Sequence, residues 1–262
     1  MMRLRTLAAA CALAIAASAC APPSRPSLPH GAGTPFPGFE SAYQQATLEC
    51  AGVRTITMEL ALSGKAGDTK LRGRINAGFA APDDMVLEGL APFGKPAFVL
   101  AARGADATLV LPRDQRVLRG AAPSAIVEAL AGVVLTPAEL RTAVAGCGLS
   151  VAATTRAGRS YGNDSVALDS EAGTVYLRRS EGRWRLSAVV RDGLTIQYAD
   201  FTGGRPATVF VRTAVADLAL RLSQTEINVP LDPRVFDIDV PQNAVPLTIE
   251  ELRRAGPLGD AR

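Results

Sequence analysis

Residues 85–100 read Met-Val-Leu-Glu-Gly-Leu-Ala-Pro-Phe-Gly-Lys-Pro-Ala-Phe-Val-Leu, two strand-like apolar runs on either side of a turn. The runs cover 85–91 and 97–101, and between them lie Pro92, Phe93, Gly94, Lys95 and Pro96. Pro and Gly are common in turns because Pro fixes φ and Gly tolerates positive φ. Phe93 has no such role, so its ring either folds back onto the sheet or is displayed for a partner. We place this hairpin in the middle of one sheet and expect the orientation of Phe93 to bear on function.

The residues around this hairpin alternate between apolar and polar with a period of two. In 53–64 the apolar positions are Ile56, Met58, Leu60 and Leu62, and in 71–79 they are Leu71, Ile75, Ala77 and Phe79. Such alternation predicts strands with one dry and one wet face. Hairpin turns are predicted at 64–68 and 81–84, and further strands at 106–111, 116–119, 173–179, 183–191, 194–201, 206–213 and 215–226. The sequence therefore predicts about ten or eleven antiparallel strands in one domain.

Four segments carry helix signals. Residues 39–48 have apolar side chains near helical spacing, which predicts a short amphipathic helix. The pattern in 123–131 opens with Pro and stops before Gly132, a favoured residue just past a helix end. Residues 136–139 and 248–251 match capping boxes, in which Thr and Glu side chains bond the first turn of a helix. We expect the two mid-chain helices to lie on the dry face of the sheet as a lid.

The N-terminus carries the pattern of an exported protein. Residues 1–19 resemble a secretory signal, with Arg3 and Arg5 before an apolar run too short to span a bilayer. Residues 17–20, Ala-Ser-Ala-Cys, resemble a bacterial lipobox, which implies that Cys20 is lipidated, and Ala21 after it implies sorting to the outer membrane, facing the periplasm. The alternative is a secreted periplasmic protein with Cys20 as a free thiol. Residues 20–38 hold six prolines and no apolar periodicity, which predicts a tether.

Charge and cysteine content narrow the class of protein. Removal of residues 1–19 takes away two of the 28 Lys and Arg residues and none of the 25 acidic ones, so the net charge becomes 26 − 25 = +1 and gives no reason to expect nucleic acid binding. Cys11 leaves with the signal and Cys20 is the lipidation candidate, so Cys50 and Cys147 remain. In an oxidising compartment this pair predicts a disulfide, worth about 4–5 kcal/mol for a loop of about 100 residues. The alternative is two buried thiols.

Candidate sites for catalysis or metal binding are poorly supported. Residues 158–162, Gly-Arg-Ser-Tyr-Gly, match the nucleophile-elbow motif by letters, but no apolar strand precedes them and no helix pattern follows. We interpret them as a loop. The only histidine, His30, lies in the tether, and no cysteine cluster has zinc spacing. Asp83 and Asp84 fit a solvated turn better than a cation site. No cofactor or metal is expected.

The order of these elements and three stretches resemble LolB-like outer-membrane lipoproteins, which have the LolA/LolB lipoprotein-localisation fold. The stretches are 87–94 (Leu-Glu-Gly-Leu-Ala-Pro-Phe-Gly), 109–113 (Leu-Val-Leu-Pro-Arg) and 130–137 (Leu-Ala-Gly-Val-Val-Leu-Thr-Pro). The match covers about 39–230. It implies a mainly β fold, an incomplete antiparallel β-barrel of about eleven strands with a helical lid. The domain would cover 39–262, with a Pro-rich tail after 230 that departs from the family.

The resemblance also implies two sites. LolB-like proteins carry an exposed apolar residue on the loop after the third strand, which implies a membrane-contact loop of Pro92, Phe93, Gly94 and Lys95. A cavity for acyl chains would be lined by Met58, Leu60, Ile75, Leu87, Leu186, Ile196, Leu218 and Leu220. Binding there would act through hydrophobic burial, at about 0.8 kcal/mol per buried CH₂, without chemistry on the ligand.

Two function hypotheses follow, and neither is an enzyme. The first is an outer-membrane-anchored lipoprotein that binds acyl chains or lipoproteins, for lipoprotein insertion or lipid transfer, with a periplasmic carrier protein as delivery partner. The second is a structural or assembly lipoprotein that binds a protein of the cell envelope at its rim or sheet edge. A co-purified acyl ligand would separate the first from the second.

Overall fold

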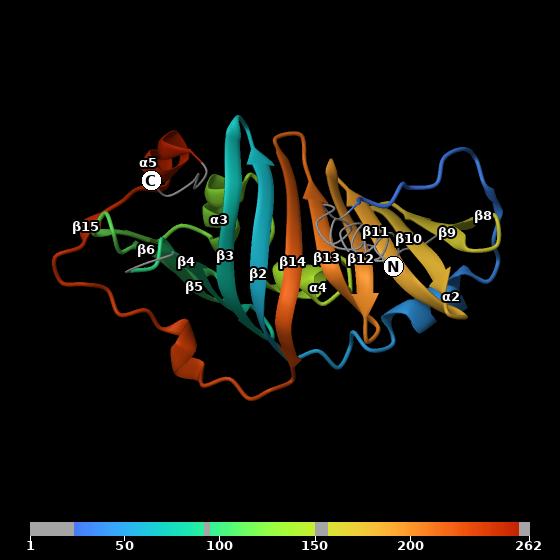
Figure 1. Ribbon diagram of the computed structural model, residues 1–262, viewed down its shortest axis with the longest axis horizontal. Helices are drawn as coiled ribbons and strands as arrows, with labels where there is room; N and C mark the ends of the chain where they lie inside the picture. The colour runs from blue at the N-terminus through green and yellow to red at the C-terminus, as the bar shows by residue number, and fades with distance from the viewer. Residues whose placement is uncertain (1–23, 92–94, 150–156, 257–262) are drawn as a thin grey trace, which may run out of the picture.

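The computed structural model describes residues 24–91, 95–149 and 157–256. Fifteen strands of these residues form one sheet, in the order β1-β8-β9-β10-β11-β12-β13-β14-β2-β3-β4-β5-β6-β7-β15. Neighbouring strands are antiparallel except for β15, which runs parallel to β7. The sheet curves without closing (Figure 1), so the molecule is the incomplete, mainly β barrel that the sequence predicts.

The strands form two antiparallel meanders that meet at the pair β14–β2. The first meander consists of β2 (Thr55–Ala66), β3 (Thr69–Ala80), β4 (Asp84–Leu90), β5 (Phe98–Arg103), β6 (Asp106–Leu111) and β7 (Arg116–Arg119). The second consists of β8 (Ala157–Tyr161), β9 (Ser165–Ser170), β10 (Gly173–Ser180), β11 (Arg183–Arg191), β12 (Leu194–Thr202), β13 (Arg205–Arg212) and β14 (Ala216–Ile227). Two-residue strands, β1 (Thr34–Pro35) and β15 (Val245–Pro246), complete the two ends of the sheet.

Two local predictions are wrong. The predicted turn at 64–68 shrinks to Gly67 and Asp68, because β2 continues to Ala66. Gly64 lies within β2 instead, where the absence of a side chain lets β14 approach closely. Its φ is 139°, and a Cβ there would lie 2.1 Å from the carbonyl oxygen of Asp217 on β14. The predicted loop at 158–162 is strand β8 and its turn. Strands β8 and β9 and the two-residue strands β1 and β15 were not predicted, which is why the sheet has more strands than expected.

The predicted helices are confirmed. They are α2 (Phe39–Thr47), α3 (Pro123–Ala131), α4 (Pro137–Val144) and α5 (Ile249–Ala255), with a 3₁₀ turn η3 (Pro233–Phe236). α3 ends at Gly132, whose φ of 72° is the left-handed cap conformation. Both capping boxes are formed, by Thr136 with Glu139 and by Thr248 with Glu251.

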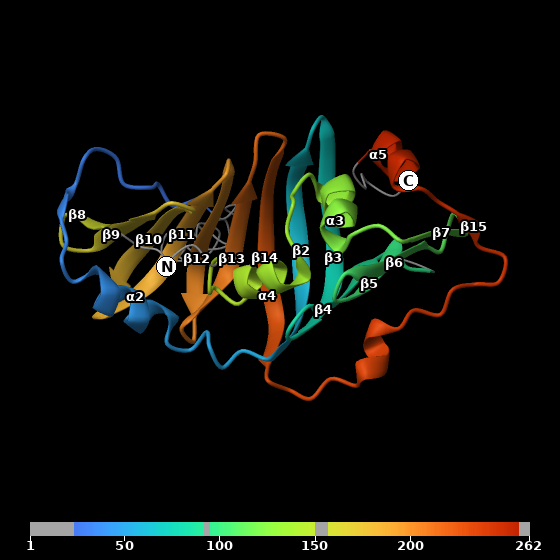
Figure 2. The same cartoon turned by 180° about the vertical axis from the view of Figure 1, so that it is seen from behind.

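The helices α3 and α4 lie on one face of the sheet, which we call the inner face (Figure 2). Two apolar clusters fill the space beneath them. One joins β2–β6 to α3, and the other joins β9–β14 to α2 and to the segment around α4. The predicted lid is therefore in place, and the core lies between it and the inner face.

Both ends of the described chain extend over the sheet. We call residues 24–36 the N-terminal strap. It runs along the opposite, outer face and ends in β1, which pairs with β8. After β14 the chain passes η3, which contacts β4 and β5, and then pairs β15 with β7. α5 reaches the inner side and packs against α3, where Arg253 pairs with Glu128 at 3.1 Å. The C-terminal segment thus wraps around the β7 edge.

Candidate functional site

All eight residues of the predicted cavity lie at the inner face. Met58 and Leu60 belong to the first apolar cluster, and Ile75 and Leu87 pack against it. The other four belong to or contact the second cluster: Leu186, Ile196, Leu218 and Leu220. Five of the eight are at most 5% exposed. The structure therefore brings the predicted residues onto one surface, where most of them are covered by protein.

One part of this surface is only partly covered. Leu62, Ile75, Leu220 and Leu222 are half-buried on the three adjacent strands β14, β2 and β3. In the strand register Leu220 faces Leu62, and Leu222 and Ile75 flank Leu60. Leu140 of α4 is also half-buried, and both it and Leu222 contact the two clusters. We call Leu62, Ile75, Leu140, Leu220 and Leu222 the seam, because they lie where the two clusters meet.

The seam has room beside it on β3. Gly73 lies opposite Leu62 in the register, and it is exposed. A Cβ at Gly73 would have no heavy atom within 4 Å. Leu62, Leu140 and Leu222 are not among the site residues predicted from the sequence. Leu62 was already part of the predicted apolar alternation, but the position of α4 over the sheet could not be predicted from a local pattern.

The N-terminal end of α4 is fixed by a charged side chain. Glu139 accepts hydrogen bonds from the Thr136 backbone N–H at 3.0 Å and from Arg191 of β11 at 2.6 Å. Burial by itself would raise the pKa of Glu139, but the bonds from Thr136 and Arg191 outweigh it and lower the pKa below the ordinary value. The charged carboxylate therefore holds the start of α4 to the second meander.

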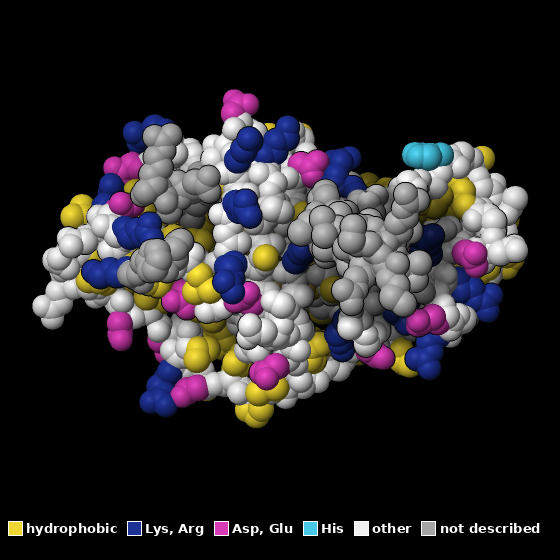
Figure 3. Space-filling view, in the orientation of Figure 1, with side chains coloured by type: hydrophobic (Ala, Val, Ile, Leu, Met, Phe, Trp, Pro, Cys, Tyr) yellow, Lys and Arg dark blue, Asp and Glu magenta, His cyan; other side chains and the backbone are white. Residues whose placement is uncertain are grey.

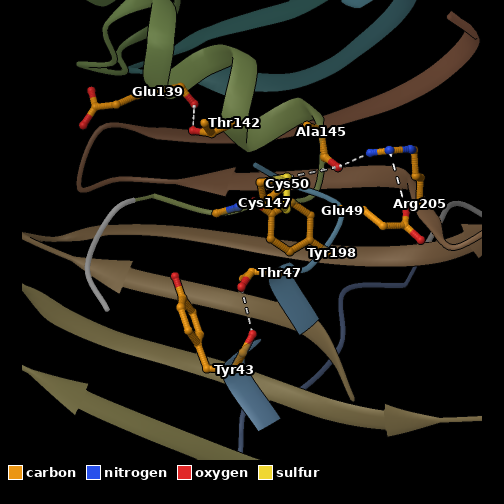
Figure 4. Close-up of a disulfide and its surroundings, with 11 residues drawn as sticks. Tyr43, Thr47, Glu49, Cys50, Glu139, Thr142, Ala145, Cys147, Tyr198 and Arg205 are labelled. Carbon is orange, nitrogen blue, oxygen red and sulfur yellow. Dashed lines mark hydrogen bonds and ion pairs between the residues drawn. A yellow bond between two sulfur atoms is a disulfide. The ribbon is translucent and has the colours of Figure 1, made fainter. Parts of the chain in front are cut away.

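The C-terminal end of α4 is fixed by the predicted disulfide (Figure 4). Cys50, between α2 and β2, is bonded to Cys147, with a Cα–Cα distance of 5.6 Å. Arg205 of β13 links the same two segments, since it donates to the Ala145 carbonyl at 3.4 Å and pairs with Glu49 at 3.7 Å. Both ends of α4 are thus tied to other elements, and the helix is held across the seam.

The buried Tyr198 lies beside the disulfide (Figure 4). Its hydroxyl accepts a hydrogen bond from the Gly148 N–H at 3.2 Å. Burial raises the pKa of Tyr198 far above its ordinary value, so the hydroxyl stays protonated. This hydrogen bond further restrains the segment that follows α4.

The outer face carries a groove that the sequence did not predict. Its volume is about 540 Å³, and it lies between β2–β4 and the segment around η3. Polar side chains such as Thr57, Asn76 and Glu88 line it together with Leu231 and Val235. Arg103 of β5 holds the η3 segment, since it donates to the Pro233 carbonyl at 2.5 Å and to Asp237 at 3.0 Å. The groove is on the face opposite the seam and is separate from it.

Several predicted sites fall on residues that the structure does not describe. These are the lipidation candidate Cys20 and three residues of the membrane-contact loop, Pro92, Phe93 and Gly94. Lys95, the fourth residue of that loop, is exposed. Ser160 of the nucleophile-like motif lies on β8, where its hydroxyl is 2.7 Å from that of Thr34, and a strand rather than a helix follows.

No group of three or more His, Cys, Asp or Glu side chains in ranges 24–91, 95–149 and 157–256 could hold a metal ion. Within the same ranges no helix has the length and apolar character needed to cross a membrane.

No protein-family model matches the chain, and no curated protein matches it. Among solved structures it is similar to a LolA superfamily protein from Nitrosomonas europaea, with a TM-score of 0.50, 13% identity, and coverage of 76% of this chain and 95% of the other. A domain of a candidate outer membrane lipoprotein-sorting protein from Vibrio parahaemolyticus gives a TM-score of 0.47, 11% identity, and coverage of 76% and 97%. At these identities the likeness concerns the fold, and the first match supports it. The chain therefore has a LolA/LolB-like fold, an incomplete antiparallel barrel whose inner face is closed by short helices.

Proposed function

We propose that this protein is a lipid-anchored periplasmic lipoprotein that binds acyl chains, free or attached to a lipoprotein, against the inner face of its sheet. The seam carries this proposal: half-buried leucine and isoleucine side chains gather on three adjacent strands beneath one short helix. An acyl chain laid along it would gain about 0.8 kcal/mol per buried CH₂. The likeness to a LolA superfamily protein and the lipobox-like residues 17–20 support the same role.

The arrangement binds and releases without covalent chemistry. α4 is eight residues long, and its two ends are tied while its middle covers the seam. A ligand would enter by displacing Leu140 from the apolar clusters. The apolar contacts that Leu140 loses would then be replaced by apolar contacts with the ligand. Because the contacts are apolar and non-directional, the site would select for chain length and shape rather than for a headgroup.

Native mass spectrometry of the protein purified from its membranes tests this proposal directly. We expect a bound species with the mass of a fatty acid or phospholipid. Binding of a dansyl-labelled fatty acid gives the quantitative form of the test. Leu62→Glu places a charge in the seam and should weaken probe binding at least tenfold, because burying an unpaired carboxylate is costly.

Ser63→Glu is the matched control for that variant. Ser63 is the next residue on β2, it is exposed, and it points to the outer face, so the added charge is the same and the site is untouched. Thermal melts of both variants separate loss of binding from loss of folding. Equal probe binding by both variants, with both folded, would exclude the seam as the acyl site.

The anchor is tested by fractionation of cells. Cys20→Ser removes the proposed lipid attachment point, and the variant should move from the membrane fraction to the soluble periplasmic fraction. Under this proposal the lipid anchors the protein in the outer membrane. If the variant still partitions with the membrane, the claim that Cys20 carries the anchor fails. That outcome would leave acyl binding as a separate question.

The assembly hypothesis receives less support. In one form of it a partner strand adds to a free sheet edge. At each end of the sheet a two-residue strand of this chain already pairs with the next strand, β1 with β8 and β15 with β7. Pro35 and Pro246 in those short strands have no backbone N–H to offer to a further strand.

A further inference from the structure

The N-terminal strap begins at a fixed point on the outer face. Arg25 forms an ion pair with Asp217 of β14, and its guanidinium carbon lies 5.1 Å from the ring centre of Phe210 on β13. The next residue, Pro26, accepts a hydrogen bond from the buried Gln197 of β12 at 2.6 Å. These contacts join the strap to three adjacent strands. The chain therefore leaves the described residues on the outer face of β12–β14.

A group of basic side chains lies on the same face, next to this point. Lys65, Lys70, Arg72 and Arg221 occupy outer-face positions of β2, β3 and β14, and all four are exposed. Figure 3 shows Lys and Arg side chains gathered over the upper part of these strands. Lys65 lies opposite Asp217 in the register, so the group starts beside the ion pair of Arg25. We call these four residues the basic stripe.

The charge of the stripe is not neutralised locally. Within the part of the chain that the structure describes, none of the four forms an ion pair. Two outer-face carboxylates of the same strands are already paired, Asp217 with Arg25 and Arg212, and Glu59 with Arg74. Two further acidic residues belong to these strands and their hairpin: Asp68 lies at the tip of the β2–β3 hairpin, and Glu226 lies opposite Thr57 near the other end of β14. Because the chain without residues 1–19 has a net charge of only 26 − 25 = +1, the stripe is a local excess.

We propose that the outer face of β14, β2 and β3 lies against a bilayer with anionic headgroups. The orientation rests on the proposed lipidation of Cys20, which is five residues before Arg25 and, fully extended, at most about 18 Å from it. An anchor this close to β14 brings the basic stripe to the membrane surface. The seam, on the inner face, then points toward the periplasm, where a ligand or carrier can reach it.

Vesicle flotation with the unlipidated chain, Ala21 onward, tests this surface without the anchor. The wild-type chain should bind vesicles that contain phosphatidylglycerol and phosphatidylcholine, and it should not bind phosphatidylcholine alone. The combined variant Lys65→Gln, Lys70→Gln and Arg72→Gln should bind the anionic vesicles about 100-fold more weakly, since one basic residue near such a surface contributes about fivefold. Salt should weaken the wild-type binding strongly.

A charge-matched control tests whether the loss of vesicle binding is specific to this face. Arg113, Arg183 and Arg254 are exposed and lie in the β6–β7 turn, at the start of β11 and in α5. Their combined change to Gln removes the same charge and should alter vesicle binding by less than about threefold. As a direct contact probe, Ser63→Cys labelled with an environment-sensitive dye should report an apolar shift on anionic vesicles.

Three results would overturn the proposal: no binding to anionic vesicles, equal binding to neutral ones, or an equal loss in the control variant. Thermal melts of both triple variants exclude unfolding as the cause. Since the assay contains neither the lipid anchor nor an acyl ligand, failure of the proposed function would leave its outcome unchanged.

Discussion

Gly146, just past α4, shows how a single residue fixes the position of the helix. Its φ is 77°, and a Cβ there would lie 2.5 Å from Cδ of Pro206 on β13. The proline ring cannot rotate out of the way as a flexible side chain would. Glycine is therefore required at this position for two reasons, its backbone conformation and its close contact with β13.

The first prediction separates these two effects. Gly146→Ala should cost about 1–2 kcal/mol for the left-handed conformation and about 1–3 kcal/mol more for the clash with Pro206. Gly182→Ala is the control, because its φ is 76° and its Cβ would have no heavy atom within 4 Å. Denaturant melts of the two variants give the difference. Equal losses would show that the contact with Pro206 has no energetic effect.

Phe93 keeps its sequence-based prediction, since it lies outside the described residues. If the ring is displayed for membrane contact, Phe93→Ala should change the free energy of unfolding by less than about 0.5 kcal/mol. A core phenylalanine would cost about 3–5 kcal/mol instead. Denaturant melts and vesicle binding by the unlipidated chain form the paired measurement. A large loss of stability with unchanged vesicle binding would place Phe93 in the core.

At the scale of elements, α4 is held by one ionised group whose effect depends on pH. The pKa of Glu139 is lower in the folded protein than the ordinary value of 4.5. A lowered folded-state pKa means that the charged form favours folding, so the stabilisation is complete above about pH 4.5 and is lost as the pH falls through the folded-state pKa.

Glu139→Gln should therefore destabilise the protein at pH 7 by about 1 kcal/mol, a size typical of a lost cap. At a pH below the folded-state value, wild type and variant should have nearly the same stability. Denaturant melts at pH 7 and near pH 2.5 provide the comparison. Glu40→Gln, at the first turn of α2, is the control for removal of a carboxylate near a helix N-terminus. A loss for Glu139→Gln that is the same at both pH values would contradict the argument.

The elements that sequence analysis predicted well are those whose ends carry local signals. α3 lies at 123–131 as expected because Pro and Gly132 mark its two ends, and the capping box at Thr136 marks the start of α4. β6 and β7 also have their expected bounds. β8 was missed because it lies near the sheet edge and has only one buried residue, Gly158, so its sequence shows no apolar alternation.

Features that depend on distant segments were outside the reach of a local pattern. The apolar alternation located the inner face, and the cysteine count located the disulfide. Neither could show that Leu140 of α4 and Leu222 of β14 contact the same two apolar clusters, or that the predicted tether packs on the outer face. Those contacts join residues far apart in the sequence, and the half-buried state of the seam follows from them.

For the molecule as a whole, an open sheet presents two edges that could pair with other copies of the chain. This protein covers both with its own terminal segments, each through a two-residue strand that contains proline. At the β8 edge, Thr34 lies opposite Ser160, and the Phe36 N–H donates to the Gly158 carbonyl at 2.8 Å. The strap therefore protects an edge in addition to leading toward the proposed anchor.

Removal of the strap should expose that edge and cause association. A chain that starts at Phe36 keeps the packing of the Phe36 ring near Trp184, but it loses β1. We expect it to form concentration-dependent dimers or larger species, measured by sedimentation velocity over a hundredfold range of concentration. A chain that starts at Leu28 lacks Arg25 and Pro26 but retains β1, and it should stay monomeric like the chain from Ala21 onward. This pair separates edge protection from the outer-face contacts of the strap, and a monomeric Phe36 chain at all concentrations would show that β8 needs no cover.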